Sequence, residues 1–312
     1  MTELSLSQLK AFDATARLGS MSAAARALGL SQPTVSAHIA RLEAHHGLEL
    51  FFRRGQRIEL TDFGRVLHDT TKRIFRAEDD AWALLASARN RYQGRLTVCA
   101  VGPYNVTPML KRFRARWPLV DLVVSLGDSR QIVEQILDYQ GDIGVLVHAV
   151  DDPRIHCVPF RRQPLVVFAR RDHPLAGRTG LRLRDLSGHE FVVRESGSTT
   201  RKVFEERMAR AQVPVRSGVE IGSREALREA VAEGLGLGVV AEPAYVADVR
   251  LVRLDIADLD AWTHVHAICL ADRQTVPLVE GFLAIVDELA RELSLPTVLA
   301  HPLRTGSSSV KP

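Results

Sequence analysis

Two short helical patterns joined by a tight turn, within residues 20–43, constrain the fold of this chain more than any other stretch. Ser22 has the side chain of an N-cap for the first helix, which is rich in alanine. Gly29 supplies the permissive backbone at which that helix ends. Ser31 then caps a second helix, and Pro33 falls in its first turn, where a missing N–H costs nothing. This spacing predicts a helix-turn-helix.

The second helix has an apolar face and a polar face. Val35, Ile39 and Leu42 recur at helical spacing, so we expect them to face the core. The opposite face is hydrogen-bonding and uncharged at its start, which suits the reading of base edges in a major groove. A small helical hairpin inside a core is the alternative. The residues of this region that we expect to contact DNA are Ser22, Gln32, Pro33, Thr34, Ser36, His38 and Arg41.

A basic segment follows the two helices. Two short apolar runs within residues 47–60 flank the sequence Arg-Arg-Gly-Gln-Arg, which predicts a β-hairpin wing. Arg53, Arg54 and Arg57 would then contact backbone phosphates; an ordinary surface hairpin is the alternative. Residues 1–92 hold 13 Lys and Arg against 10 Asp and Glu, whereas the remainder holds 28 against 27. The basic excess therefore lies beside the helix-turn-helix.

A long helical pattern begins at Thr61 and runs to about Arg91. A helix of about 30 residues spans about 45 Å, which is too long for a small winged domain to cover. We therefore expect residues 61–92 to form a linker helix that packs against its twin. Such pairing predicts a homodimer, or a homotetramer made of two dimers.

From residue 94 the pattern changes to short apolar strands that alternate with helices. This βαβα order predicts parallel sheets covered on both faces. The glycine-rich run Gly234–Gly238 follows a helix and precedes a strand, the reverse of what phosphate binding requires. It therefore predicts a tight helix-to-strand connection and not a dinucleotide site.

The remaining signals exclude several classes of protein. Cys99, Cys157 and Cys269 lie far apart in apolar runs, so neither a disulfide framework nor a metal site is expected. No nucleophile elbow, Walker loop or zinc-ligand spacing is present, so we expect no catalytic residues, metal or cofactor. The N-terminus lacks an apolar signal core, and no run is long enough to cross a bilayer. We expect a cytoplasmic protein with no membrane contact.

A pattern of residues runs through the N-terminal third of the chain: Leu9…Phe12, Ser22-Ala23-Ala24-Ala25-Arg26-Ala27-Leu28, Ser31-Gln32-Pro33-Thr34-Val35-Ser36, Ile39, Leu42-Glu43, Leu48, Leu50-Phe51, Arg53 and Leu60-Thr61…Gly64. With this pattern, residues 1–92 resemble the DNA-binding half of the LysR-type transcriptional regulators. In that family the rest of the chain resembles a periplasmic solute-binding fold, with two α/β subdomains that close on a small ligand. The resemblance implies an α+β multidomain protein with a winged helix-turn-helix over 1–60, the linker helix over 61–92 and an effector-binding domain over 93–300.

The same resemblance divides the effector-binding domain. Subdomain I would comprise residues 93–161 and 268–300, and subdomain II residues 162–267. The connections near Arg161–Pro164 and His266–Cys269 would serve as hinges. Residues 301–312, rich in Ser, Gly and Pro, would form a flexible tail.

Four loops lie where a strand ends and a helix begins, which is where open α/β sheets bind ligands. The family builds its effector cleft from these loops, although hydroxyls at helix starts are commonly plain caps. Small hydroxyls, helix N-termini and a nearby arginine favour an anionic effector. The stretches 194–201 and 220–226 resemble the subgroup associated with 2-aminoethylphosphonate breakdown, so our hypothesis is a phosphonate catabolite. The candidate effector residues are Tyr104, Asn105, Ser129, Ser198, Thr199, Thr200, Arg201 and Ser223.

Together these features predict a DNA-binding transcription regulator that a small anionic effector switches. Its partners would be double-stranded DNA, the effector and further copies of the chain. The alternative is a solute-binding or enzymatic α/β protein with an accessory DNA-binding domain. A third reading, an architectural DNA binder without an effector, leaves the two-lobed half of the chain unexplained.

Overall fold

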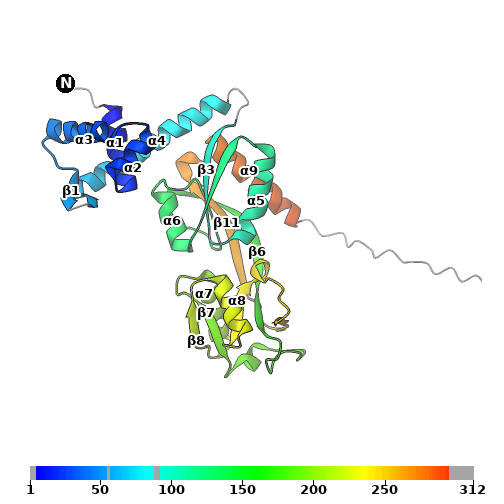
Figure 1. Cartoon of the computed structure of the whole chain (residues 1–312). Helices are drawn as coiled ribbons and strands as arrows, with labels where there is room; N and C mark the ends of the chain where they lie inside the picture. The colour runs from blue at the N-terminus through cyan, green and yellow to red at the C-terminus, as the bar shows by residue number, and fades with distance from the viewer. Residues whose placement is uncertain (1–4, 55–56, 88–91, 295–312) are drawn as a thin grey trace, which may run out of the picture.

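The computed structural model describes residues 5–54, 57–87 and 92–294. It has three parts: a helical N-terminal domain, a long helix α4, and two α/β lobes that lie one beyond the other (Figure 1). The expected tail and the last residues of the expected linker helix lie outside the described residues. No helix in the described ranges has the length and apolar character to cross a membrane.

The N-terminal domain packs three helices and a hairpin around one core. Phe12 of α1 is fully buried with Val35, Ile39 and Leu42 of α3, so the apolar face predicted for the second helix is confirmed. Figure 1 shows these helices together at the N-terminal end of the molecule. The elements are α1 (Leu6–Leu18), α2 (Met21–Leu28), α3 (Gln32–His46), β1 (Phe51–Arg54), β2 (Arg57–Leu60) and α4 (Asp62–Ser87).

One predicted helix cap is wrong by two residues. The side chain of Ser20, not Ser22, accepts the hydrogen bond from the Ala23 N–H, at 3.3 Å. Ser22 lies in the first turn of α2, where its side chain is exposed. Both serines precede the alanine run, and Ser20 is the one with the extended backbone that an N-cap requires.

The start of α4 is fixed against the hairpin. The Thr61 hydroxyl accepts a hydrogen bond from the Gly64 N–H at 2.9 Å and donates one to the Glu49 carbonyl at 2.8 Å. Gly64 packs against the carbonyl of Leu50 so closely that a Cβ would collide with it. The predicted cap at Thr61 is confirmed, and Gly64 is required by this contact.

The two lobes share one sheet with the strand order β4-β3-β5-β11-β6-β9-β7-β8, and β10 pairs with β6. Lobe I has its core around β3, α5, β5 and α9, and lobe II has its core around β7, α7 and β9. The elements are β3 (Gly94–Ala100), α5 (Pro103–Arg116), β4 (Val120–Leu126), α6 (Ser129–Leu137), β5 (Ile143–Leu146), β6 (Ile155–Arg170), β7 (Glu190–Arg194), α7 (Thr199–Arg210), β8 (Arg216–Ile221), α8 (Arg224–Ala232), β9 (Leu237–Ala241), β10 (Leu251–Leu254), β11 (Trp262–Leu270) and α9 (Pro277–Ser294), with short 3-10 turns η1 (Leu183–Leu186), η2 (Glu242–Ala244) and η3 (Ala271–Arg273).

Two antiparallel strands, β6 and β11, run from one lobe into the other (Figure 1). The segments expected to be hinges lie inside these strands, and β6 is a single strand of 16 residues. The register of the pair shifts between Val265 and His266. Val265 already packs in the lobe I core, so the expected boundary at residue 268 falls within β11. The lobes are therefore joined by a continuous two-stranded ribbon with a bulge.

The glycine-rich run forms the helix-to-strand connection that the sequence predicts. Gly234 and Gly236 have positive φ angles of 84° and 148°. Gly236 passes so close to the Glu190 carbonyl that a Cβ would lie 2.6 Å from that oxygen. The glycines are therefore required by backbone geometry and not by a phosphate.

Candidate DNA-binding face and effector cleft

The second helix of the helix-turn-helix, α3, is held with one face outward. The Ser31 hydroxyl accepts a hydrogen bond from the Thr34 N–H at 3.3 Å, which confirms the predicted cap. Of the side chains expected to reach DNA, those of Gln32, Pro33 and Arg41 are exposed, and those of Thr34, Ser36 and His38 are half-buried.

The middle of the outward face of α3 is made of small side chains, of which the sequence analysis selected only Pro33. Ala37, Ala40 and Ala44 follow Pro33 at intervals of four, three and four residues, and all four are exposed. Such residues let a helix backbone approach a groove closely, and alanine can contact a thymine methyl group. Attention to polar side chains alone missed the three alanines, although their spacing is visible in the sequence.

The predicted wing is present as the antiparallel pair β1 and β2, with Phe51 opposite Leu60. Arg54 pairs with Arg57 at its outer end, so the backbone places two of the three wing arginines beside the turn. The side chains of Arg53, Arg54 and Arg57 lie outside the described residues. The Glu43 carboxylate, at the end of α3, accepts the Leu50 N–H at 2.8 Å and so ties the wing to α3.

A small cavity lies between the two lobes. Its volume is ≈ 20 Å³, which is room for about one water molecule. Three of the predicted effector residues line it, namely Tyr104, Asn105 and Thr200. The other lining residues come from both lobes and the ribbon between them: Val101, Gly102, Val147, Gln163, Arg224, Ala241, Pro243 and Ala244.

Arg224 closes this cavity. It is the first residue of α8 in lobe II, and its guanidinium donates a hydrogen bond of 2.7 Å to the Val101 carbonyl of lobe I. A Cβ on Gly102 would lie 3.2 Å from the same guanidinium, so the glycine makes room for it. Burial, and secondarily the charge of Arg194, lowers the pKa of Arg224 to about 10. Among the described residues Arg224 forms no ion pair.

A second arginine lies on the lobe I side of the cleft. Arg161 donates to the Asn105 side-chain oxygen from Nε at 3.0 Å and from Nη2 at 2.5 Å. Asn105 is neutral, and burial lowers the pKa of Arg161. Arg161 and Arg224 thus place two cationic groups at the junction of the lobes with only neutral oxygen partners in the described chain.

Unpaired polar atoms gather on the ribbon beside the same cleft. Gln163 Oε1 and Thr263 Oγ1 are buried without a hydrogen-bond partner in the described structure, and these two residues face each other across β6 and β11. His148 Nδ1, just beyond β5, is in the same state. Buried polar groups ordinarily have partners, and three of the six exceptions among the described residues lie on or beside this ribbon.

The remaining predicted effector residues do not line the cavity. Arg201 is already neutralised by Glu205 at 2.7 Å and Glu220 at 2.6 Å. Ser198 and Ser223 accept the N–H groups of Arg201 and Ala226, as plain helix caps do. Thr199 is the first residue of α7 and Ser129 the first of α6, where Asp128 is the cap.

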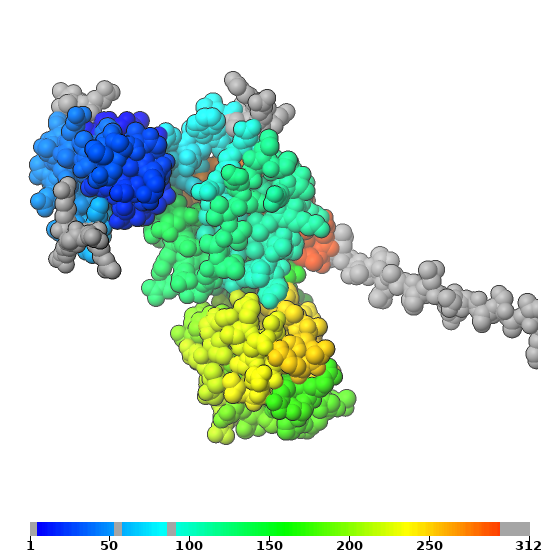
Figure 2. Space-filling model, viewed as in Figure 1, coloured from blue at the N-terminus to red at the C-terminus, as the bar shows by residue number. Residues whose placement is uncertain are grey.

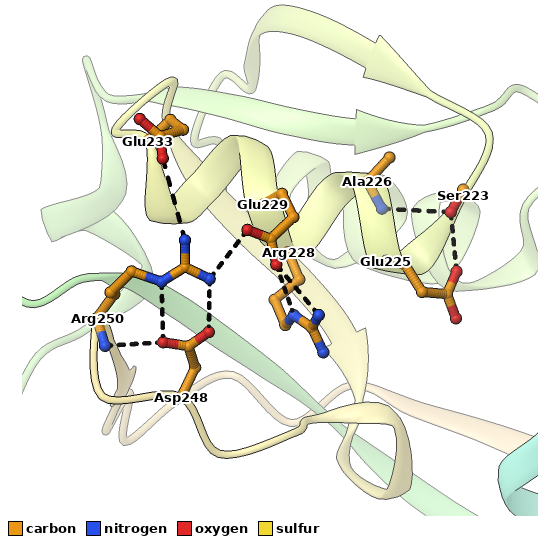
Figure 3. A network of polar contacts seen from close by, with 8 residues as sticks. All are labelled: Ser223, Glu225, Ala226, Arg228, Glu229, Glu233, Asp248 and Arg250. Carbon is orange, nitrogen blue, oxygen red and sulfur yellow. Dashed lines mark hydrogen bonds and ion pairs between the residues drawn. The ribbon is translucent and has the colours of Figure 1, made fainter.

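Figure 3 shows two other arginines around α8, each paired with a carboxylate. Arg250 meets Asp248 at 2.7 Å and Glu229 at 2.9 Å, and Arg228 meets Glu229 at 3.1 Å. Arg224 differs from these two because it bonds to lobe I and forms no ion pair among the described residues. Sequence analysis missed Arg224, Arg161 and Gln163, although the first lies in a loop it selected and the other two near a hinge it predicted.

Comparison with known proteins agrees with this architecture. Residues 6–65 match the family model described as bacterial regulatory helix-turn-helix protein, lysR family, and residues 89–291 match the LysR substrate binding domain. The HTH-type transcriptional activator CmpR of Synechocystis is 32% identical over 288 residues, covering 91% of this chain and 95% of that protein.

Two solved structures are informative. A full-length OxyR variant from Pseudomonas aeruginosa superposes with a TM-score of 0.73 at 18% identity, covering 93% of this chain and 95% of that one. The regulatory domain of Synechocystis CcmR, in complex with 2-PG, superposes with a TM-score of 0.59 at 29% identity, covering 65% of this chain and all of that one. The chain therefore belongs to the LysR family of DNA-binding transcription regulators.

Proposed function

We propose that this regulator acts in the cytoplasm and is switched by a small anion that binds between its lobes and interacts with Arg224 and Arg161. The observation that carries the proposal is the half-buried guanidinium of Arg224, which lies between the lobes and forms no ion pair among the described residues. Partial burial makes such a cation costly, and an anionic ligand would compensate it. The 2-PG bound to the regulatory domain of CcmR supports an anion of that class.

The cavity must open for such a ligand. At ≈ 20 Å³ it admits no anion larger than water, so a ligand would have to displace the Arg224 side chain from the Val101 carbonyl. Displacement of that contact would let the lobes rotate about the β6–β11 ribbon. The ligand would thus favour one lobe arrangement over the other, which is a shift between populations.

Calorimetric titration of the full-length protein tests the effector class. We expect heat of binding with 2-PG and, if the phosphonate hypothesis holds, with 2-aminoethylphosphonate. Benzoate, an aromatic acid without a phosphorus oxyanion, serves as the control ligand. Binding of benzoate with no response to either phosphorus compound would contradict the proposal.

We further propose that α3 reads DNA bases and that the wing contacts phosphates. Exposed Gln32 and half-buried Ser36 flank the small outward residues of α3, which supports base contacts by both. Arg53→Ala should weaken binding to all sequences alike and reduce the slope of log affinity against log salt by about 1. Ser36→Ala should instead relax sequence choice. An unchanged salt slope for Arg53→Ala would remove the wing from the interface.

Exposed apolar side chains along α4 support pairing of two copies. Val66 is 65% exposed, Trp82 72% and Leu85 71%, and all lie on one long helix. We propose that α4 packs against α4 of a second copy, in a homodimer or in a tetramer made of two dimers. Val66→Asp should shift the sedimentation coefficient toward the monomer, whereas Asp69→Asn on the same helix should leave it unchanged.

A further inference from the structure

Two buried side chains on the ribbon between the lobes present unsatisfied oxygens on one face. Gln163 of β6 is 4% exposed and lines the cavity, and its Oε1 has no hydrogen-bond partner in the described structure. Thr263 of β11 is 1% exposed, and its Oγ1 likewise has no partner among the described residues. Directly paired residues of antiparallel strands point to the same face of a sheet, so both side chains lie on the cleft side of the ribbon.

The two oxygens have complementary hydrogen-bonding roles. The amide oxygen of Gln163 only accepts a hydrogen bond, whereas the hydroxyl of Thr263 also donates one. A ligand hydroxyl satisfies both, because it donates to Gln163 and accepts from Thr263. An ammonium group has no acceptor, so it leaves the Thr263 proton unpaired.

The surroundings of these oxygens are cationic. Arg161 precedes Gln163 by two residues on β6, so their side chains point to the same face, about 6.6 Å apart along the strand. The Arg161 guanidinium donates to Asn105, which lines the same cavity, and Arg224 borders the cavity from lobe II. These arginines repel a positive group on a ligand, whereas a neutral hydroxyl carries no such penalty.

We infer that the effector carries a hydroxyl group besides its anionic group, and that Gln163 and Thr263 recognise this hydroxyl. The inference rests on the proposed function, in which Arg224 and Arg161 bind the anionic group. The cleft thus selects a small hydroxy acid over the same anion without its hydroxyl, because the latter leaves buried polar groups unpaired. Figure 2 shows the surfaces of the two lobes in contact at their junction, so a ligand reaches the ribbon only when the lobes separate.

Calorimetric titration of the full-length protein with matched ligands tests the hydroxyl. Ethylphosphonate and 2-hydroxyethylphosphonate have the same anionic group and differ by one hydroxyl. We expect the hydroxyl compound to bind about tenfold more tightly, as one satisfied buried polar group provides. Propionate and lactate repeat the comparison with a carboxylate, so the test does not depend on phosphorus. 2-Aminoethylphosphonate, the ammonium analogue, should bind less tightly than 2-hydroxyethylphosphonate.

Three variants connect the hydroxyl preference to the ribbon. Gln163→Leu nearly preserves side-chain size and removes Oε1, so it should bind the two members of a pair alike. Thr263→Val should reduce the preference in part. Gln140→Leu, the same change at an exposed position after α6, should keep the tenfold ratio. A general loss of fold stability weakens both ligands of a pair equally, so a merely structural role of Gln163 would leave the ratio unchanged.

Three outcomes overturn the inference while the proposed function stands. One is equal affinity of the unsubstituted protein for both members of a pair that binds, as expected if a bound water already satisfies the two oxygens. The second is a hydroxyl preference that both Gln163→Leu and Thr263→Val retain. The third is tighter binding of 2-aminoethylphosphonate than of 2-hydroxyethylphosphonate. Absence of binding by all of these anions would instead contradict the proposed function, and the inference would fall with it.

Discussion

Two arginine sites at contacts between parts of this molecule differ in electrostatics. At the contact of α4 with lobe I, Arg273 and Arg76 share Asp142, and Arg273 also pairs with Asp80. At the contact of lobe I with lobe II, Arg224 and Arg161 donate hydrogen bonds to the Val101 carbonyl and the Asn105 side-chain oxygen. The first site contains ion pairs, and among the described residues the second contains none.

The difference indicates what each contact is for. The first site compensates its own charges, so it stabilises the contact of α4 with lobe I without a ligand. The second places half-buried cations near Gln163 Oε1 and Thr263 Oγ1, which have no hydrogen-bond partner among the described residues, and an anion there would compensate the cations. Removal of a charge should therefore have opposite consequences at the two sites.

The largest expected effect is at the paired site. Arg273→Met would leave Asp80 without its partner and Asp142 with only Arg76, so we expect the free energy of unfolding to fall by about 3 kcal/mol. Arg112→Met is the control, because Arg112 pairs with Glu288 and Glu292 on the surface and should cost less than about 1 kcal/mol. Urea denaturation measures both. Equal losses in the two variants would erase the distinction between the sites.

The matching change at the unpaired site should act on binding and not on stability. Arg224→Met removes a half-buried charge that forms no ion pair in the described chain, so the free energy of unfolding without ligand should stay constant or rise. Affinity for 2-PG should fall about 30-fold, or about 2 kcal/mol, if the anion interacts with this guanidinium. Calorimetry and urea denaturation together check the two signs. If the Arg224→Met protein binds 2-PG normally but unfolds more easily, Arg224 stabilises the fold and does not bind the effector.

Most elements of the fold could be predicted from local sequence signals. Ser31, Pro33 and the spacing of apolar residues specify the second helix, because caps and periodicity act over a few residues. The sequence analysis expected short strands, whereas β6 is a single strand of 16 residues, because Pro159 and Pro164 interrupt the sequence pattern of a long strand. In the pairing of β6 with the antiparallel strand β11, Pro159 lies at the bulge and Pro164 lies opposite the first residue of β11.

The sites themselves depend on contacts that no local pattern encodes. Arg76 and Asp142 are 66 residues apart, and Arg273 and Asp80 are 193 apart. The cleft brings Arg224 to the Val101 carbonyl over 123 residues. The loops could be predicted because parallel strands end at one edge, but the choice of Arg224 over Arg201 depends on which arginine already has carboxylates nearby.

A smaller effect on stability is expected at two buried threonines, because only one of their hydroxyls has hydrogen-bond partners among the described residues. Thr263 Oγ1 is buried without a partner, so Thr263→Val should raise the free energy of unfolding by about 1 kcal/mol. Thr61 is also buried, but its hydroxyl both donates and accepts. Thr61→Val should therefore lower that free energy by about 1 kcal/mol. If Thr263→Val destabilises the protein as much as Thr61→Val does, the Thr263 hydroxyl is not an unsatisfied group that destabilises the ribbon.

The smallest expected effect is the pH dependence near the cleft. Burial, then the charges of His266 and Lys202, lowers the pKa of His148 below its usual 6.5. The unfolded chain therefore binds this proton first, and His148 makes the fold less stable as the pH falls below about 6.5. An anion in the cleft would raise the pKa of His148 and flatten this loss. His173, whose pKa is also lowered by burial but whose ring packs at a tilt against His189 in lobe II, supplies the contrast. Melting temperatures are measured from pH 7.5 to 5.5, with and without 2-PG. We expect the slope of melting temperature against pH to depend on the ligand, and His148→Gln to reduce this dependence while His173→Gln does not. An equal reduction by both variants would show that His148 does not sense a ligand in the effector cleft.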